Sequence, residues 1–387
     1  MAKVNVRLCL RALTGAILLL SMQGAVAAGP TAGGMTSDNV EYLMHMPFEA
    51  GSATGARVVG DYLYVTSWKS LSIYDVSDPL EPARLSITPF GFGFENEDVE
   101  VTPDGEHLFF AESAPQSVLH VWNAEDKSNP IEVATLPGAG EHTANCVLSC
   151  RYLYGADSFA VDPRQSSSGV VDVRDPANPK LVGAWDEAEE IEGYAHDVFE
   201  ARDGLAVTSK IQILDVSNPL KPRLLAQSAD GRALHSISWP NGGRDRFILG
   251  SDETNADATC SETSGAFQTF DTRGWRRTHT IHHVEDFRAE KGTTLDGNAT
   301  VNVLGCSSHW FQAHPKFRHG GLVAVGFYEH GTRFVEVAKD GLIEEVGYFL
   351  PFAGSTSAAY WLTDRIVYAV DYARGIDVLR YNGEIDP

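Results

Sequence analysis

One phrase recurs along this chain and constrains its fold more than any other feature. LSIYDVSDPLEP at residues 71–82 returns as IQILDVSNPLKP at 211–222, as GVVDVRDPANPK at 169–180 and, in diverged form, as HVWNAEDKSNPIE at 120–132. Such a repeat indicates one supersecondary unit copied several times, each copy burying its apolar face against its neighbours. The Asp and Ser of the phrase are expected to bond nearby backbone amides while Pro fixes φ, which predicts a stiff turn between strands.

The segments around this phrase are typical of short β-strands. GDYLYVTS, DGEHLFFAES and DGLAVTS each continue from a Gly-Asp or Asp-Gly turn into an apolar strand, and no window shows sustained helical spacing. Units begin near residues 55, 97, 142, 196, 235, 309 and 357. Their length of about 51 residues is typical of four-stranded propeller blades. The sequence therefore predicts an all-β protein, a seven-bladed β-propeller.

The two ends of the chain are predicted to meet. The last unit, SAAYWLTDRIVYAVDYARGIDVLRYN, contains only three clear strands, and the early segment NVEYLMHMPF can supply the fourth. Pairing an N-terminal strand with the last blade would close the ring and remove exposed strand edges.

The N-terminal 27 residues have the three-part pattern of a secretory signal peptide. Three basic residues precede an apolar stretch too short for a convincing membrane span, and Ala-Val-Ala follows at 25–27. We expect residues 1–27 to be removed, leaving a single domain over 28–387 that is exported to the periplasm or secreted. The net charge of −22 becomes −25 after this cleavage. That charge disfavours nucleic acid and anionic membrane as partners.

Four cysteines follow the signal segment, an even number that suits an oxidising compartment. We favour a local disulfide, Cys146–Cys150, and a second, Cys260–Cys306, which would close a long insert over 252–305 in the fifth blade. The alternative is a four-cysteine zinc site, which normally uses tighter paired spacing than this chain has.

The repeated units LSIYDVSDP and IQILDVSNP, together with the blade head AHDV, resemble those of LVIVD-repeat proteins. The resemblance covers essentially the whole chain after the signal segment, although the units from about 235 to 350 depart from the short repeat. Membership of this family implies a β-propeller and, in many members, export. It implies much less about activity, because one architecture serves many functions.

Aligning the blade heads through their Asp-Gly turns places histidines at equivalent positions on four consecutive blades. EDVEVTPDG aligns with HDVFEARDG, so Glu97 occupies the position of His196. The same position holds His142, His235 and His309. The first strand of each propeller blade lines the central channel, so these imidazoles should converge on the axis. They would suit a divalent iron, copper, zinc or manganese ion.

Carboxylates beside these histidines extend the predicted site. Glu141 and Asp197 are sequence neighbours of candidate ligands and would hold them in one tautomer. Glu97 is the candidate general acid-base. His314 would reach the channel mouth from a loop.

Two classes of function remain open. The first is an exported metalloenzyme, an oxidoreductase or lyase acting on a small organic molecule in the channel. The second is a non-catalytic propeller that presents its loops to a protein or glycan at the cell surface, with histidines that are structural because copying a blade copies its hydrogen bonds. The chain has no Gly-x-Ser-x-Gly motif, phosphate loop or His-Glu-x-x-His pair, which disfavours serine hydrolysis and nucleotide chemistry.

Overall fold

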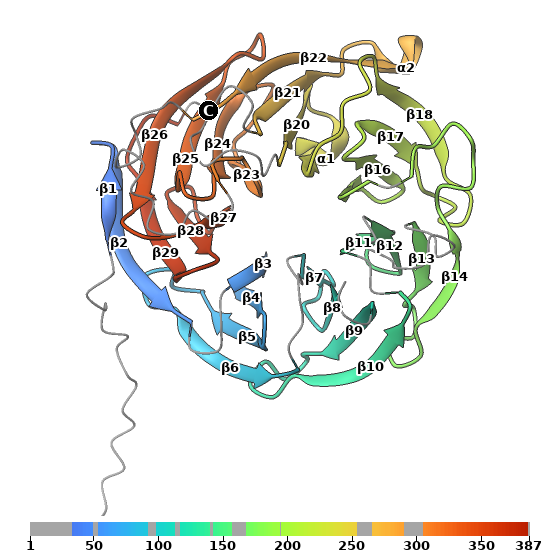
Figure 1. Ribbon diagram of the computed structural model, residues 1–387, viewed down its shortest axis with the longest axis horizontal. Helices are drawn as coiled ribbons and strands as arrows, with labels where there is room; N and C mark the ends of the chain where they lie inside the picture. The colour runs from blue at the N-terminus through green and yellow to red at the C-terminus, as the bar shows by residue number, and fades with distance from the viewer. Residues whose placement is uncertain are drawn as a thin grey trace, which may run out of the picture.

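Seven blades surround a central channel in the computed structural model (Figure 1). The structure describes residues 33–48, 53–91, 98–112, 117–139, 142–156, 168–193, 195–253, 265–289 and 305–385. These residues form 29 strands and two four-residue helical turns, α1 (Pro240–Gly243) and α2 (Trp275–Thr278). Neither turn is long or apolar enough to cross a membrane, and the described ranges contain no other helix. The prediction of an all-β seven-bladed propeller is confirmed.

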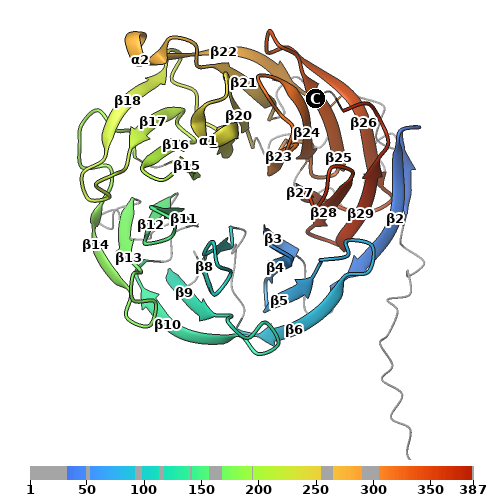
Figure 2. The ribbon, with the colours of Figure 1, turned by 180° about the vertical axis from the view of Figure 1, so that it is seen from behind.

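Each blade is an antiparallel sheet that begins beside the channel and ends at the rim (Figures 1 and 2). The first three blades are formed by β3 (Ala53–Val59), β4 (Tyr62–Ser67), β5 (Ser70–Asp75) and β6 (Ala83–Pro89); by β7 (Glu100–Val101), β8 (His107–Glu112), β9 (Val118–Asn123) and β10 (Ile131–Pro137); and by β11 (Thr143–Val147), β12 (Tyr152–Ala156), β13 (Gly169–Asp172) and β14 (Lys180–Ala184).

The next three blades follow the same order. They are formed by β15 (Val198–Arg202), β16 (Leu205–Thr208), β17 (Gln212–Asp215) and β18 (Arg223–Ser228); by β19 (Ser236–Ser238), β20 (Phe247–Ser251), β21 (Phe267–Asp271) and β22 (Thr280–Phe287); and by β23 (Phe311–Ala313), β24 (Gly321–Gly326), β25 (Thr332–Val337) and β26 (Ile343–Pro351). The seventh blade contains β27 (Thr356–Trp361), β28 (Ile366–Asp371) and β29 (Gly375–Tyr381).

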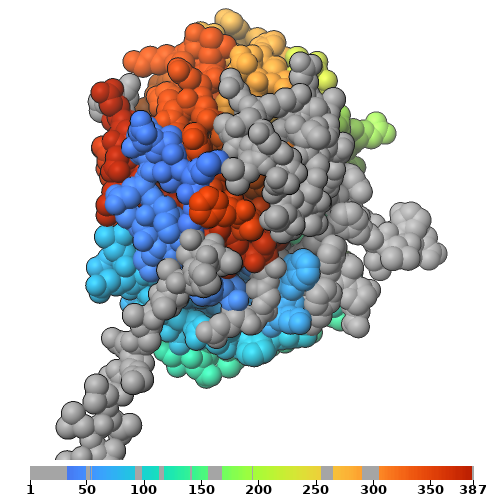
Figure 3. All heavy atoms as spheres, turned by 60° about the vertical axis from the view of Figure 1, so that its left-hand side comes forward, coloured from blue at the N-terminus to red at the C-terminus, as the bar shows by residue number. Residues whose placement is uncertain are grey.

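The two ends of the chain meet in the seventh blade, as predicted. β2 (Val40–Pro47) pairs antiparallel with β29, in a register that runs from Val40 opposite Tyr381 to Pro47 opposite Gly375. β1 (Gly34–Thr36) adds a fifth strand to the sixth blade by pairing with β26. Figure 3 shows these blue N-terminal strands lying against orange and red segments from the end of the chain. The ring of blades is therefore closed by strand pairing.

The interpretation of all of 252–305 as an insert was wrong for its middle part. β21 and β22 lie within it and complete the fifth blade, because β21 pairs antiparallel with both β20 and β22. FQTFD and TIHHVEDF are not followed by the Asp-Val-Ser-x-Pro phrase that marked other blades, so their sequence did not identify them as blade strands. Residues 254–264 and 290–304 lie outside the described part of the chain.

The apolar core is divided into seven clusters, one between each pair of neighbouring blades. Between the fourth and fifth blades, for example, Val207 and Ile213 pack with Ile248 and Phe270, and all four are fully buried. Burying one such side chain contributes about 1.5–3 kcal/mol. Each blade is thus stabilised by both of its neighbours, and the seventh and first blades share a cluster like the others.

Polar bonds fix the turns of the repeated phrase and tie blades together. The Asp75 carboxylate accepts the Ser77 amide at 2.9 Å and that of Asp215 accepts the Ser217 amide at 3.0 Å, as the sequence predicts. Tyrosines on second strands donate to carbonyls of the next blade: Tyr64 to Gly105 at 3.0 Å, Tyr154 to Pro219 at 2.7 Å and Tyr368 to Pro79 at 2.8 Å. The last of these bonds joins the seventh blade to the first.

We predict that ring closure by β2 stabilises the whole propeller. A chain starting at residue 48 lacks β1 and β2, loses Val40 and Met46 from their clusters and exposes the edge of β29. Its thermal midpoint should fall by more than about 5 °C relative to a chain starting at residue 33, and it should aggregate more readily. Differential scanning calorimetry measures this, and equal midpoints for the two chains would contradict a stabilising role for β2.

Candidate metal site in the central channel

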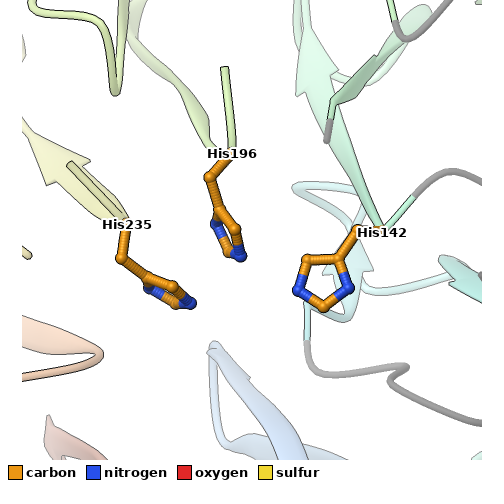
Figure 4. A group of neighbouring side chains, drawn as sticks. All are labelled: His142, His196 and His235. Atoms are coloured by element: carbon orange, nitrogen blue, oxygen red, sulfur yellow. The ribbon is translucent and has the colours of Figure 1, made fainter. Parts of the chain in front are cut away.

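The four predicted histidines lie together at one end of the channel. His142 and His235 immediately precede the first strands of their blades, β11 and β19, while His196 and His309 stand two residues before β15 and β23. All four therefore lie within two residues of the start of the innermost strand of their blade. Figure 4 shows the rings of His142, His196 and His235 pointing toward one another from neighbouring blades.

The imidazoles form a continuous row. Ring centroids are 4.7 Å apart between His142 and His196, 3.7 Å between His196 and His235, and 4.1 Å between His235 and His309. One ring nitrogen from each of the first three lies within 4.8 Å of the others. Tetrahedral zinc with bonds of about 2.1 Å would hold its nitrogens roughly 3.4 Å apart. Modest side-chain rotations would bring three nitrogens onto one ion.

Glu253 is a site residue that the sequence analysis missed. Its carboxylate forms a second candidate ligand group with His235 and His309, whose ligand atoms also lie within 4.8 Å of one another. Its Oε2 atom is 3.9 Å from Nε2 of His235, and its Oε1 atom accepts the Tyr328 hydroxyl. Strand pairing in the structure explains its position: the His235 amide donates to the carbonyl of Ser251, the last residue of β20, and Glu253 lies two residues beyond it.

Two oxygen atoms of Ser357 contact the His309 ring. Nδ1 of His309 lies 2.9 Å from the carbonyl oxygen of Ser357 on the next blade and 3.2 Å from its hydroxyl. In the tautomer that carries its proton on Nδ1, the ring donates to the carbonyl and Nε2 keeps its lone pair, whereas in the other tautomer Nδ1 accepts the hydroxyl. Metal-ligating histidines usually have the first arrangement, in which the other ring nitrogen donates to a carbonyl or carboxylate.

Residues beside the histidines bond each blade head to the next blade. The Thr143 hydroxyl donates to the His196 carbonyl at 2.5 Å, the Asp197 carboxylate accepts the Ile237 amide at 2.9 Å, and the Ser236 hydroxyl donates to the His309 carbonyl at 2.8 Å. We call these three contacts the head bonds. These bonds fix the relative positions of the four histidine backbones, on the third to sixth blades, and the bond from His309 to Ser357 continues the series to the seventh blade.

The other predicted site residues are placed differently. The Asp197 carboxylate bonds the next blade instead of a histidine ring, because successive side chains of an extended chain point to opposite sides. Glu97 and Glu141 lie outside the described residues. His314 is separate from the four-histidine cluster: its Nε2 donates to the Asp364 carbonyl at 3.1 Å and its Nδ1 accepts the Lys316 amide.

The cysteines form a disulfide at the channel. Cys146 and Cys150 are joined with an S–S distance of 2.04 Å. Glu100 lies close to both sulfurs, but bonded sulfurs are not thiolate ligands, so this group is no metal site and the four-cysteine zinc alternative loses two of its ligands. Cys306 is also disulfide-bonded, and its expected partner Cys260 lies outside the residues that the structure describes.

A cavity of about 620 Å³ lies further along the same first strands. Its wall includes Arg57, Glu100, Asp197, Trp310 and Tyr360. The indole of Trp310 also approaches the histidines, with ring centroids 5.4 Å from His235 and 6.3 Å from His196. Trp310 therefore contacts both the histidine cluster and the cavity.

Acidic groups outnumber the cation in the deep part of this cavity. Nη2 of Arg57 lies 2.8 Å from the Glu100 carboxylate and 3.2 Å from that of Asp98. Burial raises the pKa of Asp197 to about 7, against the opposing effects of the Ile237 amide and of Arg57. Burial likewise raises the pKa of Glu100, which Arg57 opposes.

Removing one head bond should destabilise the propeller. In Ser236→Ala the buried His309 carbonyl loses its donor, and we expect the free energy of unfolding to fall by about 1–3 kcal/mol. Ser238→Ala, on the same strand but half-buried, is the matched control and should change it by less than about 0.5 kcal/mol. Urea unfolding measures both variants. If Ser236→Ala is as stable as Ser238→Ala, the Ser236 bond contributes nothing to stability.

The raised pKa of Asp197 makes stability depend on pH. Between about pH 4 and pH 7 the folded state binds a proton that the unfolded state has released, so the free energy of unfolding falls as pH rises. Asp197→Asn keeps an acceptor for the Ile237 amide and lacks this proton. Between pH 4.5 and pH 8 the wild type should therefore lose stability that the variant keeps. The free energy of unfolding of the variant minus that of the wild type should rise by at least about 1 kcal/mol over this range. Parallel urea curves for the metal-free proteins at both pH values test this, and a pH-independent difference would refute it.

Comparisons with known proteins agree with this architecture. The LVIVD repeat model matches residues 50–86. No curated protein matches the sequence. Similar solved structures are that of U3-55K (11% identity, 89% of this chain and 98% of the other, TM-score 0.55) and that of the RRP9 WD40 repeats (12%, 91% and 99%, 0.54). A third is the β-propeller domain of Myceliophteria thermophila Cps50 (Swd1) (13%, 87% and 99%, 0.56). At these identities the likeness shows the fold alone: the chain is a β-propeller, and the LVIVD repeat model matches one of its repeats, at residues 50–86.

Proposed function

We propose that the four-histidine cluster is a transition-metal site in an exported β-propeller. In this proposal the protein is an oxidoreductase or lyase that acts on a small organic molecule. The observation that carries the proposal is the convergence of His142, His196, His235 and His309 from four consecutive blades. Neutral imidazole binds iron, copper, zinc and manganese, so the side chains suit a divalent ion of this series.

His235 belongs to both candidate ligand groups and is therefore the central ligand of the proposal. The group of His142, His196 and His235 offers three nitrogens, which suits zinc or copper. The group of His235, His309 and Glu253 offers two histidines and one carboxylate, the ligand set of non-haem iron sites that keep open positions. The second group favours an oxidoreductase.

The residues around the cluster support a reaction on a small molecule. A cavity of about 620 Å³ has room for such a molecule, and Trp310 contacts both this cavity and the histidines. Asp197 lines the cavity with a pKa raised by burial to about 7, so it can hold or release a proton near neutral pH. Among the described carboxylates it takes the acid-base role that the sequence analysis gave to Glu97.

A non-catalytic binding propeller is the second candidate. The observation that supports it is the contact of His309 with Ser357, which joins the sixth blade to the seventh and needs no metal. Loops at the rim would then contact a protein or glycan. The two candidates differ in one property that can be measured: the second requires no metal.

We predict that the purified chain binds about one equivalent of a transition metal. His235→Ala removes a ligand from both groups and should lower metal affinity more than about 100-fold, whereas His142→Ala or Glu253→Gln should weaken it strongly only if its own group holds the ion. Elemental analysis gives the content, and a Co²⁺ titration followed by visible absorption gives the affinity and the geometry.

His282→Ala is the matched control, because His282 is exposed on β22. It should bind metal like the wild type. Circular dichroism and thermal midpoints establish that each variant is folded. A folded wild type that neither contains nor takes up a metal would contradict the metal site and favour the non-catalytic candidate.

A further inference from the structure

We propose that the cavity next to the histidine cluster is a binding site for a small organic cation, an amine or a guanidine. The cavity lies along β11, β15, β19 and β23, beyond the ends that carry the histidines. Its volume of about 620 Å³ is within the range of ligand sites. It is the cavity to which the proposed function assigns a small molecule, so this inference names the class of that molecule, although the binding itself needs no metal.

The charge of the wall favours a cation. Its deep part contains three carboxylates, Asp98, Glu100 and Asp197, each at most 14% exposed, and a single guanidinium, Arg57. Arg57 pairs with Asp98 and Glu100. The Asp197 carboxylate accepts the neutral Ile237 amide, and the Val198 amide and Arg57 also favour its charged form. Buried carboxylates in excess of cations are costly, and a bound cation would offset that cost.

The remaining charged groups of the wall do not reverse this balance. Glu200 accepts the amides of Leu148 and Ser149, which satisfies it without a cation. Arg202 and Arg318 donate to backbone carbonyls. Over the described lining residues the five carboxylates exceed the three guanidiniums, so an anion would meet repulsion.

Two aromatic side chains of the wall suit an organic cation. Trp310 and Tyr360 both line the cavity, and the electron-rich face of an aromatic ring attracts ammonium and guanidinium groups. The indole N–H of Trp310 is buried and has no hydrogen-bond partner among the residues that the structure describes. That donor would be satisfied by a hydroxyl or carbonyl oxygen elsewhere on the bound cation, because the ammonium or guanidinium group itself has no acceptor.

A bare metal ion fits this cavity less well. Among the described residues, the deep carboxylates do not form a group of three whose oxygens converge as the histidine nitrogens do. Metal cages need ligand atoms about 2–2.6 Å from one ion. Carboxylates that are spread along the wall, with aromatic side chains beside them, instead suit a larger organic cation.

Isothermal titration calorimetry with three matched probes tests the proposal: benzylammonium, neutral benzyl alcohol and anionic benzoate. The full chain is used at pH 8, in the metal-free and the zinc-loaded form. Benzylammonium should bind at least tenfold more tightly than either other probe in both forms. Asp197→Asn and, independently, Glu100→Gln should each weaken its binding at least fivefold. Asp61→Asn is the control and should bind like the wild type, because Asp61 is exposed at a turn of the first blade and does not line the cavity.

Three results would overturn the proposal: benzoate or benzyl alcohol binding as tightly as benzylammonium, unchanged benzylammonium binding in both carboxylate variants, or no saturable binding of any probe up to millimolar concentration. If Asp197→Asn does not fold, Glu100→Gln decides alone. Benzylammonium binding by a protein that takes up no metal would leave this inference standing while the proposed metal site fails.

Discussion

Contact between neighbouring blades is the constraint on which the rest of this structure depends. A blade of four strands cannot bury both of its faces alone, and here each face packs into one of seven clusters shared with the next blade. Buried hydrogen bonds between blades fix how neighbouring blades are oriented. The second-strand tyrosines make such bonds near the turns, and the head bonds make them at the channel. The pairing of β2 with β29 extends the same constraint around the whole ring.

The candidate site follows from this constraint. No single blade contributes more than one of the four histidines, so their convergence exists only while four consecutive blades keep their positions. The head bonds involve the residues next to His142, His196 and His235, which couples the packing of the blades to the placement of the imidazoles. Stability and the geometry of the site are thus properties of the same contacts.

Most of the fold, and the positions of the histidines, could be predicted because both follow from periodicity. A repeated turn phrase marks blade boundaries, and equivalent positions in a ring must converge on its axis. Glu253 could not be found this way, since it lies two residues after a second strand ends and belongs to no repeated phrase. The role of Asp197 was misjudged because sequence adjacency to His196 does not specify direction, and β21 and β22 were missed because they lack the turn phrase.

The central claim is that imidazoles from different blades share one metal ion. X-ray absorption at the metal edge of the zinc- or cobalt-loaded protein tests this most directly, because imidazole rings give a characteristic multiple-scattering pattern beyond a nitrogen shell at about 2.0–2.1 Å. The account predicts at least two imidazoles on the ion, and fewer in His235→Ala. A spectrum without imidazole scattering, or a protein that retains no metal to measure, would contradict it.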